Sequence, residues 1–167
     1  MKKEHGFTVI ELMVTLAIVA LVLTVGVPGV KELIYNNRLT AATNSLVGSL
    51  AYARSEAVKQ GVSTSICSSS NQTSCTGSAW STGWLVWVDS DNDSTLDSPG
   101  EIVRVSEALR GTVAVSAANT TISYDATGFT ATPGTIKVCD DRTGNTGNQL
   151  QLLTGGSVSL TTRVSCP

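Results

Sequence analysis

Glu11 is a carboxylate at the start of an apolar stretch that runs from residue 6 to residue 30. A carboxylate inside a membrane segment costs about 2.5–3.5 kcal/mol at mid-bilayer and less near an edge, so it is retained where it finds a partner. The 19 residues from 12 to 30 carry no charge, and this length is just enough to span the hydrocarbon core of a bilayer. The chemistry that Glu11 offers is therefore the pairing of a charge in an apolar environment.

Catalytic chemistry has little support in this sequence. His5 is the single histidine, and it lies in a short polar leader ahead of the apolar stretch. If the leader is removed, no histidine remains, which excludes Ser-His and Cys-His nucleophilic catalysis and histidine-based zinc sites. No other group of residues supports an enzyme, and we expect no cofactor.

Four cysteines follow the apolar stretch: Cys67, Cys75, Cys139 and Cys166. None belongs to a C-x-x-C pair, and an even number behind an export segment indicates two disulfides formed in an oxidising compartment. Three pairings are possible. We favour Cys67–Cys75 and Cys139–Cys166, because each closes a local loop of Ser, Thr, Gly and Asn, with about 2.5 and 3.5 kcal/mol of stabilisation as upper estimates. Buried free thiols remain the alternative.

An acidic run offers carboxylates that could converge on a hard cation such as Ca²⁺: Asp89, Asp91, Asp93 and Asp97. Counted as an EF-hand loop from Asp89, the run has Ser94 in place of the sixth-position glycine. Gly100 occupies the position of the bidentate glutamate, and Glu101 comes one residue late. Strand patterns flank the run, whereas an EF-hand needs helices. We therefore predict a hairpin tip rich in Asx turns and no metal, with calcium as the alternative.

Three tryptophans, Trp80, Trp84 and Trp87, lie close together in the sequence. On a strand, Trp84 and Val86 point to one face, and Leu85 and Trp87 to the other. We expect one face to pack in the core against a helix, and the other face to be available to a neighbouring subunit. A stacking surface for a ligand is the alternative.

The apolar stretch is predicted to be a membrane helix. Two lysines, Lys2 and Lys3, precede it, so the positive-inside tendency keeps the leader cytoplasmic and sends the C-terminus outward. It fits a secretory signal peptide poorly, because its apolar core is too long and no A-x-A-type site closes it. Gly26, Pro28 and Gly29 interrupt this stretch and predict a kink or a locally melted turn.

A helical pattern then resumes and ends near Gly61. Its apolar positions recur at three- and four-residue spacing: Leu39, Ala42, Leu46, Leu50, Ala53 and Ala57. Eight β-type segments follow, at residues 62–67, 83–89, 101–109, 112–116, 120–125, 135–139, 150–153 and 157–164, separated by turn-rich stretches such as 141–148. The predicted fold class is α+β, with one long N-terminal helix packed on an antiparallel sheet.

The sequence Gly6-Phe7-Thr8-Val9-Ile10-Glu11-Leu12, after a short basic leader, resembles the class III signal of bacterial type IV pilins and pseudopilins. Pro28 stands where pilin helices typically carry a proline. The resemblance implies that a prepilin peptidase cuts between Gly6 and Phe7 and methylates Phe7, and that Glu11 pairs with the N-terminus of a neighbouring subunit in the fibre. The implied organisation is a leader at 1–6, a transmembrane helix at 7–30, an amphipathic helix at 31–61 and a β-rich head at 62–167.

Two further segments, "LVGSLAYARSEAVKQG" and "GWLVWVDSDNDSTLDSPGEIVRVSEAL", are similar to the GspH/FimT/FimU group of minor pilins and pseudopilins. The resemblance implies a minor pilin that helps prime pilus assembly at the fibre tip and supports twitching motility or adhesion. Its implied partners are other minor pilins, the major pilin, the prepilin peptidase and the bacterial inner membrane, with the C-terminus periplasmic before assembly. A minor pseudopilin of type II secretion is an alternative.

DNA binding is a further alternative, because FimT-like relatives resemble DNA-uptake adaptors through a C-terminal Gly-Arg-x-Arg motif. Here the nearest match, Thr162-Arg163-Val164-Ser165, keeps one arginine, and Arg142 is the other cation that could join it. The net charge of −2 gives no general basic field, so the sequence argues against a nucleic-acid partner.

Overall fold

The computed structural model describes residues 6–77 and 79–166, so the predicted leader residues 1–5, including His5, lie outside the described part. The chain divides into two compact units, Met1–Asn37 and Arg38–Pro167. The first unit is helical, and the second contains the rest of the long helix together with all the described strands.

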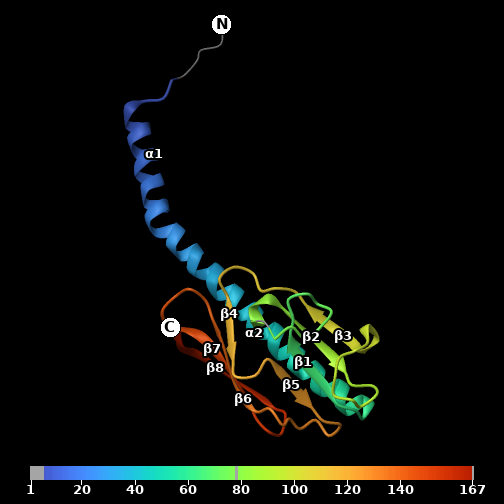
Figure 1. Cartoon of the computed structure of the whole chain (residues 1–167). Coiled ribbons are helices and arrows are strands. Elements are labelled where there is room, and N and C mark those ends of the chain that lie inside the picture. The colour runs from blue at the N-terminus through green and yellow to red at the C-terminus, as the bar shows by residue number, and fades with distance from the viewer. Residues whose placement is uncertain (1–5, 78, 167) are drawn as a thin grey trace. The chain divides into compact units, whose positions relative to one another are not determined.

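The first unit consists of consecutive helical segments without a loop between them, and the first segment is labelled α1 in Figure 1. Helix α1 covers Val9–Leu21, a π-helical turn follows at Val22–Gly26, and helix α2 begins at Val27 and continues to Gln60. The end at Gln60 agrees with the stop predicted at Gly61, whose φ of +71° is the left-handed conformation that glycine adopts at helix ends.

Of the two forms predicted for the break around Pro28, a kink or a locally melted turn, the helix does not have the melted turn. It widens into the π-helical turn one residue before α2 starts, and Pro28 lies in the first turn of α2. Proline lacks an N–H and crowds the carbonyl one turn back, and a wider turn relieves that contact. Thr24 Oγ1 donates to Ala20 O at 2.9 Å and to Leu21 O at 3.1 Å, which satisfies carbonyls beside the turn.

In the second unit, α2 buries the predicted apolar stripe. All six stripe residues, from Leu39 to Ala57, are at most 5% exposed. They share one core with side chains of both sheets, among them Ile66 on β1, Trp84 on β2 and Leu150 on β7. The long helix packed on antiparallel strands confirms the predicted α+β fold class.

Eight strands are described in the second unit: β1 (Thr64–Ser68), β2 (Trp84–Val88), β3 (Ile102–Ser106), β4 (Ala114–Ala117), β5 (Thr121–Tyr124), β6 (Gly134–Cys139), β7 (Gly144–Leu152) and β8 (Val158–Cys166). They form two four-stranded antiparallel sheets, in the orders β3-β2-β1-β5 and β4-β6-β7-β8 (Figure 1). The sequence predicted a single sheet. Strand segments look alike locally, whereas the pairing of β1 with β5 and of β4 with β6 depends on contacts between distant parts of the chain.

Strand β7 is longer than predicted, because it begins at Gly144 inside the stretch 141–148 that the sequence assigned to a turn. Gly144 pairs with Cys166, and the register shifts on both sides of Gly147. A Cβ on Gly147 would meet the sulfur of Cys166 and lie 3.0 Å from that of Cys139. The glycine that reads as a turn residue is therefore needed where β7 passes beside a disulfide.

Candidate functional site

The first turn of α1 positions Glu11. Thr8 caps the helix, because its Oγ1 accepts a hydrogen bond from the Glu11 backbone N–H at 3.3 Å. In return, the Glu11 carboxylate accepts from the Thr8 backbone N–H at 3.5 Å, which completes a capping box. This role was not predicted from the sequence, although the T-x-x-E spacing signals it. The Thr8 N–H therefore occupies one oxygen of the Glu11 carboxylate. The other oxygen can still accept hydrogen bonds from a positively charged group.

The helix that carries Glu11 presents apolar side chains in all directions. Residues 6–34 are all exposed, and Phe7 is 83% exposed. Within the described residues, the continuous helix from Val9 to Gln60 is long and apolar enough at its N-terminal end to cross a membrane. A helix that is apolar all round is stable when lipid or other apolar helices surround it.

Two disulfides hold the head, and both are the pairs favoured from the sequence. Cys67 on β1 bonds to Cys75 in the loop that follows it. Cys139 at the end of β6 bonds to Cys166 at the end of β8, and so spans β7, which lies between these strands. The favoured pairing is confirmed, and no free cysteine remains in the described part of the chain.

The acidic run forms the tip between β2 and β3, and its carboxylates bind the backbone of their own loop. Asp89 accepts from Asp93 N at 3.0 Å and from Ser94 N at 3.1 Å, and it is 1% exposed. Glu101, the residue that came one position late for an EF-hand, accepts from Ser90 N at 3.3 Å and from the amides of residues 97 and 98. These bonds are those of the predicted turn.

Two other aspartates of the tip, Asp93 and Asp97, have pKa values shifted in opposite directions. Hydrogen bonds from the side chain and backbone of Thr95 hold the pKa of Asp93 below its ordinary value. Burial raises the pKa of Asp97, and the charges of Asp91, Asp93 and Glu101 add to the rise. One oxygen from each of Asp91, Asp93 and Asp97 lies within 4.8 Å of the others. Calcium binding at this tip stays a prediction.

The tryptophans do not form a stacking surface. Trp80 Nε1 donates to Asn119 O at 3.0 Å, and Trp84 Nε1 donates to Ser49 Oγ on α2 at 2.9 Å. Trp87, on the opposite face of β2, is 4% exposed and belongs to a second small core with Cys67, Leu85, Leu96 and Ile102. The expectation that this face is open to a neighbouring subunit is wrong, because the acidic tip supplies Leu96 and folds over it.

The two cations of the DNA alternative have different surroundings. Arg142 Nη2 lies 2.7 Å from Asp140 Oδ2, and its Nε also donates to this carboxylate. Arg163 is exposed and lies on β8 with a φ of +60°. Because Arg142 is bound to Asp140, it is not available to bind phosphate. Of the two arginines considered for DNA binding, Arg163 alone is exposed.

The Asp140–Arg142 pair predicts a loss of stability in acid. Burial raises the pKa of Asp140, but the hydrogen bonds and charge of Arg142 outweigh it and leave this pKa below 3.8. Because the folded pKa is depressed, the pair stabilises the fold above pH 3.8 and the contribution is lost as pH falls through the folded pKa. Asp140→Asn should therefore lower the melting temperature at pH 7 and lose this difference from wild type once the pH is below the folded pKa. Asp141→Asn, next to it, removes an exposed charge but keeps an oxygen that can accept from the Thr112 hydroxyl, and it serves as the control.

Arg54 ties the C-terminal half of α2 to two loops, a role that was not predicted from the sequence. Its Nε donates to Gly128 O at 3.0 Å, and its Nη2 donates to Gly155 O at 2.8 Å. Gly128 has a φ of +82°, and a Cβ there would lie 3.0 Å from Val58. In the sequence Arg54 is one polar residue among the apolar positions of the helix, and no local signal identifies hydrogen-bond partners 74 and 101 residues away.

Arg54→Ala is expected to destabilise the head by about 1.5–3 kcal/mol, because it leaves two loop carbonyls without their charged donor. The measurement is urea unfolding of the unit that begins at Arg38. Lys59→Ala removes a cation that is 73% exposed on the same helix and should change stability by less than about 1 kcal/mol. Equal effects of the two changes would contradict the role of Arg54 as a tie between helix and loops.

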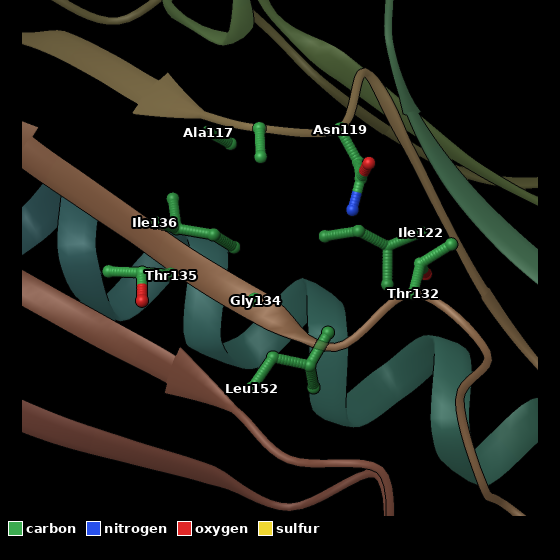
Figure 2. A pocket seen from close by; sticks show the side chains of 9 residues that line it. Ala117, Asn119, Ile122, Thr132, Gly134, Thr135, Ile136 and Leu152 are labelled. Carbon is green, nitrogen blue, oxygen red and sulfur yellow. The ribbon is translucent and has the colours of Figure 1, made fainter.

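The head contains a small cavity between its two sheets, shown in Figure 2. Ile122 on β5, Ile136 on β6 and Leu152 on β7 point toward it, with Asn119 at its rim. Its volume is about 10 Å³, which holds one water molecule and no organic ligand. The surfaces that remain for function are thus the apolar helix and the outside of the head.

Two protein-family models match the sequence of this chain. Residues 42–157 match the sequence model of the family described as type II transport protein GspH, and residues 1–27 match that of the prokaryotic N-terminal methylation motif. No curated protein matches the chain at a significant level.

Solved structures share the fold. Two crystal forms of the type IV minor pilin FimU of Pseudomonas aeruginosa superpose with TM-scores of 0.63 and 0.60, at 23% and 22% identity. They cover 78% and 77% of this chain, and 93% and 97% of their own. The minor pseudopilin EpsH of the type 2 secretion system of Vibrio cholerae superposes with a TM-score of 0.56 at 9% identity, over 75% of this chain and 97% of its own.

Proposed function

The chain belongs to the GspH family of pilin-like proteins, and on this premise we propose that it is a minor type IV pilin that helps to prime pilus assembly. It acts by polymerisation and without catalysis. The apolar helix enters the core of the fibre, and the disulfide-bonded head offers its sides to other minor pilins and to the major pilin. Its place is at or near the fibre tip, where it supports twitching motility or adhesion.

One observation carries this proposal: Glu11 lies in the first turn of α1, within a stretch whose residues from 6 to 34 are all exposed. Such a segment is stable in a membrane before assembly and among the helices of other subunits afterwards. Removal of the leader by a prepilin peptidase after Gly6 places a methylated α-amino group on Phe7. That cation, on a neighbouring subunit, is the partner of Glu11.

Before assembly the chain crosses the bacterial inner membrane once, with its head in the periplasm. Two disulfides support an oxidising location for the head. The mass of the mature N-terminal peptide tests the processing step, which predicts a peptide that begins with methylated Phe7. A chain that retains Met1 in the fibre would contradict it.

A minor pseudopilin of a type II secretion system is the second candidate. The fold shared with EpsH supports it, since EpsH is a minor pseudopilin of the type 2 secretion system. A DNA-binding minor pilin for transformation is supported by Arg163 alone, because Arg142 is paired with Asp140.

The yield of sheared surface pili from a deletion strain separates these functions. We expect the yield to collapse on deletion and to return when the wild-type gene is supplied, because a priming subunit is needed before the major pilin polymerises. Normal piliation with a defect in protein secretion would support the pseudopilin, and normal piliation with a defect in DNA uptake would support the DNA-binding pilin.

A further inference from the structure

Strand β8 is the longest of the four strands at the sheet edges. The strand orders place β3 and β5 at the edges of one sheet, and β4 and β8 at the edges of the other. β3 has five residues, β4 and β5 have four each, and β8 has nine. The outer side of β5 is covered, because Tyr124 bridges to Thr130 and Ser123 N donates to Thr132 Oγ1 at 3.3 Å.

The first part of β8 lacks the features with which proteins protect an open edge. Such features are short strands, charges, proline and bulges. A register shift opposite Val164 and the φ of +60° at Arg163 confine the bulge to the end of β8. From Val158 to Thr162 the strand pairs in regular register with β7, is uncharged and free of proline, and is exposed after Val158.

An apolar groove of about 630 Å³ runs beside this edge. It is lined by Val47, Ala51 and Val58 on the outer flank of α2, and by Val158 at the start of β8. The turn before β8 contributes Gly156 and Ser157 to the lining, so the groove lies beside the start of β8. Leu160 shares the face of Val158 and is 49% exposed, although the residue that it pairs with on β7 is fully buried.

The charged residues on β8 and in the lining of the groove are cations. Between residues 143 and 166, Arg163 is the one charged residue. At the groove, Lys59 is 73% exposed and Arg54 forms part of the wall, and no carboxylate contributes to the lining. Lys59 shares its charge with Glu56 at 3.4 Å, whereas Arg163 has an exposed side chain at the far end of the open segment.

We propose that Val158–Thr162 is a docking edge for an extended segment of a neighbouring pilin subunit, which adds to the sheet as a strand beyond β8. Backbone hydrogen bonds to β8 give the affinity, and apolar side chains that enter the groove beside Val158 give the specificity. The charge of the edge selects a segment with carboxylates at its ends, which meet Arg163 and Lys59. This inference deepens the proposed function and rests on it.

The test compares two single substitutions in the full chain, expressed in the native bacterium. Leu160→Glu places a carboxylate at the docking edge, and Val105→Glu places one on β3, at a residue that is 43% exposed on another edge. The amount of the chain in sheared fibres, relative to the membrane, should fall about tenfold or more for Leu160→Glu and stay at the wild-type level for Val105→Glu. Equal melting temperatures of the two variants keep folding defects out of the comparison.

Hydrogen exchange identifies the form of the partner. The outward amides of Val158–Thr162 should exchange about tenfold more slowly in the tip complex, enriched from fibres by a tag, than in the full chain in detergent. Unchanged exchange at β8, with the chain present in fibres, overturns the inference and leaves the proposed function in place; a partner helix in the groove would give that result. Normal incorporation of Leu160→Glu also overturns it. Absence of the wild-type chain from fibres would overturn both this inference and the proposed function.

Discussion

Replacement of Glu11 by alanine is expected to abolish complementation of a deletion strain, with the yield of sheared pili reduced about tenfold or more. Loss of one partner from a buried charge pair costs about 2–5 kcal/mol at an interface, and each 1.4 kcal/mol is a factor of ten in affinity. On the pairing proposed for Glu11, the charge left unpaired in the fibre is the α-amino group of a neighbouring Phe7. The measurement is the amount of pilin in the sheared fraction of each strain.

The capping box supplies a control that separates two roles of Glu11. Glutamine at this position keeps a side-chain oxygen to accept from Thr8 N but carries no charge. If the charge acts in assembly, Glu11→Gln should fail as Glu11→Ala does, while both proteins reach the membrane in normal amounts. If Glu11→Gln restores piliation fully, the residue acts as a helix cap, and the pairing proposed for it is wrong.

Replacement of Gly147 by valine is expected to destabilise the head by about 2–5 kcal/mol, the usual range for loss of a native disulfide in a small domain. A Cβ at Gly147 would meet both sulfurs of the Cys139–Cys166 disulfide and would lie 3.1 Å from the carbonyl of Val138. The larger side chain therefore displaces either the disulfide or β7. Thermal unfolding and a count of free thiols in the purified protein measure the two consequences.

Gly134→Val is the matched change on the neighbouring strand β6, because a Cβ at Gly134 would have no heavy atom within 4 Å. It should change stability by less than about 1 kcal/mol and leave all thiols oxidised. If the Gly147→Val and Gly134→Val proteins have the same melting temperature, and the first has no free thiol, then β7 can move away from the disulfide at little cost in stability.

Much of the architecture follows from local patterns in the sequence. Apolar spacing on α2 marked six positions that are all buried, and the loop composition around the cysteines favoured the two disulfides that form. The Gly-Phe-x-x-x-Glu motif at the start of the apolar stretch indicated a pilin or pseudopilin. These signals depend on residues a few positions apart, where the helix and strand periods are fixed by backbone geometry.

The tertiary structure decided which contacts form between segments that are far apart in the sequence. It divided the strands between two sheets, turned Gly147 from a turn residue into a neighbour of the disulfide, and gave Arg54 its two loop carbonyls. It also paired Arg142 with Asp140 and enclosed Trp87 beneath the acidic tip. The apolar N-terminal helix, its carboxylate and the α+β class were determined by the sequence alone, because composition and period specify them locally. The free edge of β8 depended on the order of strands in the sheet, which is set by packing between segments that the sequence places far apart.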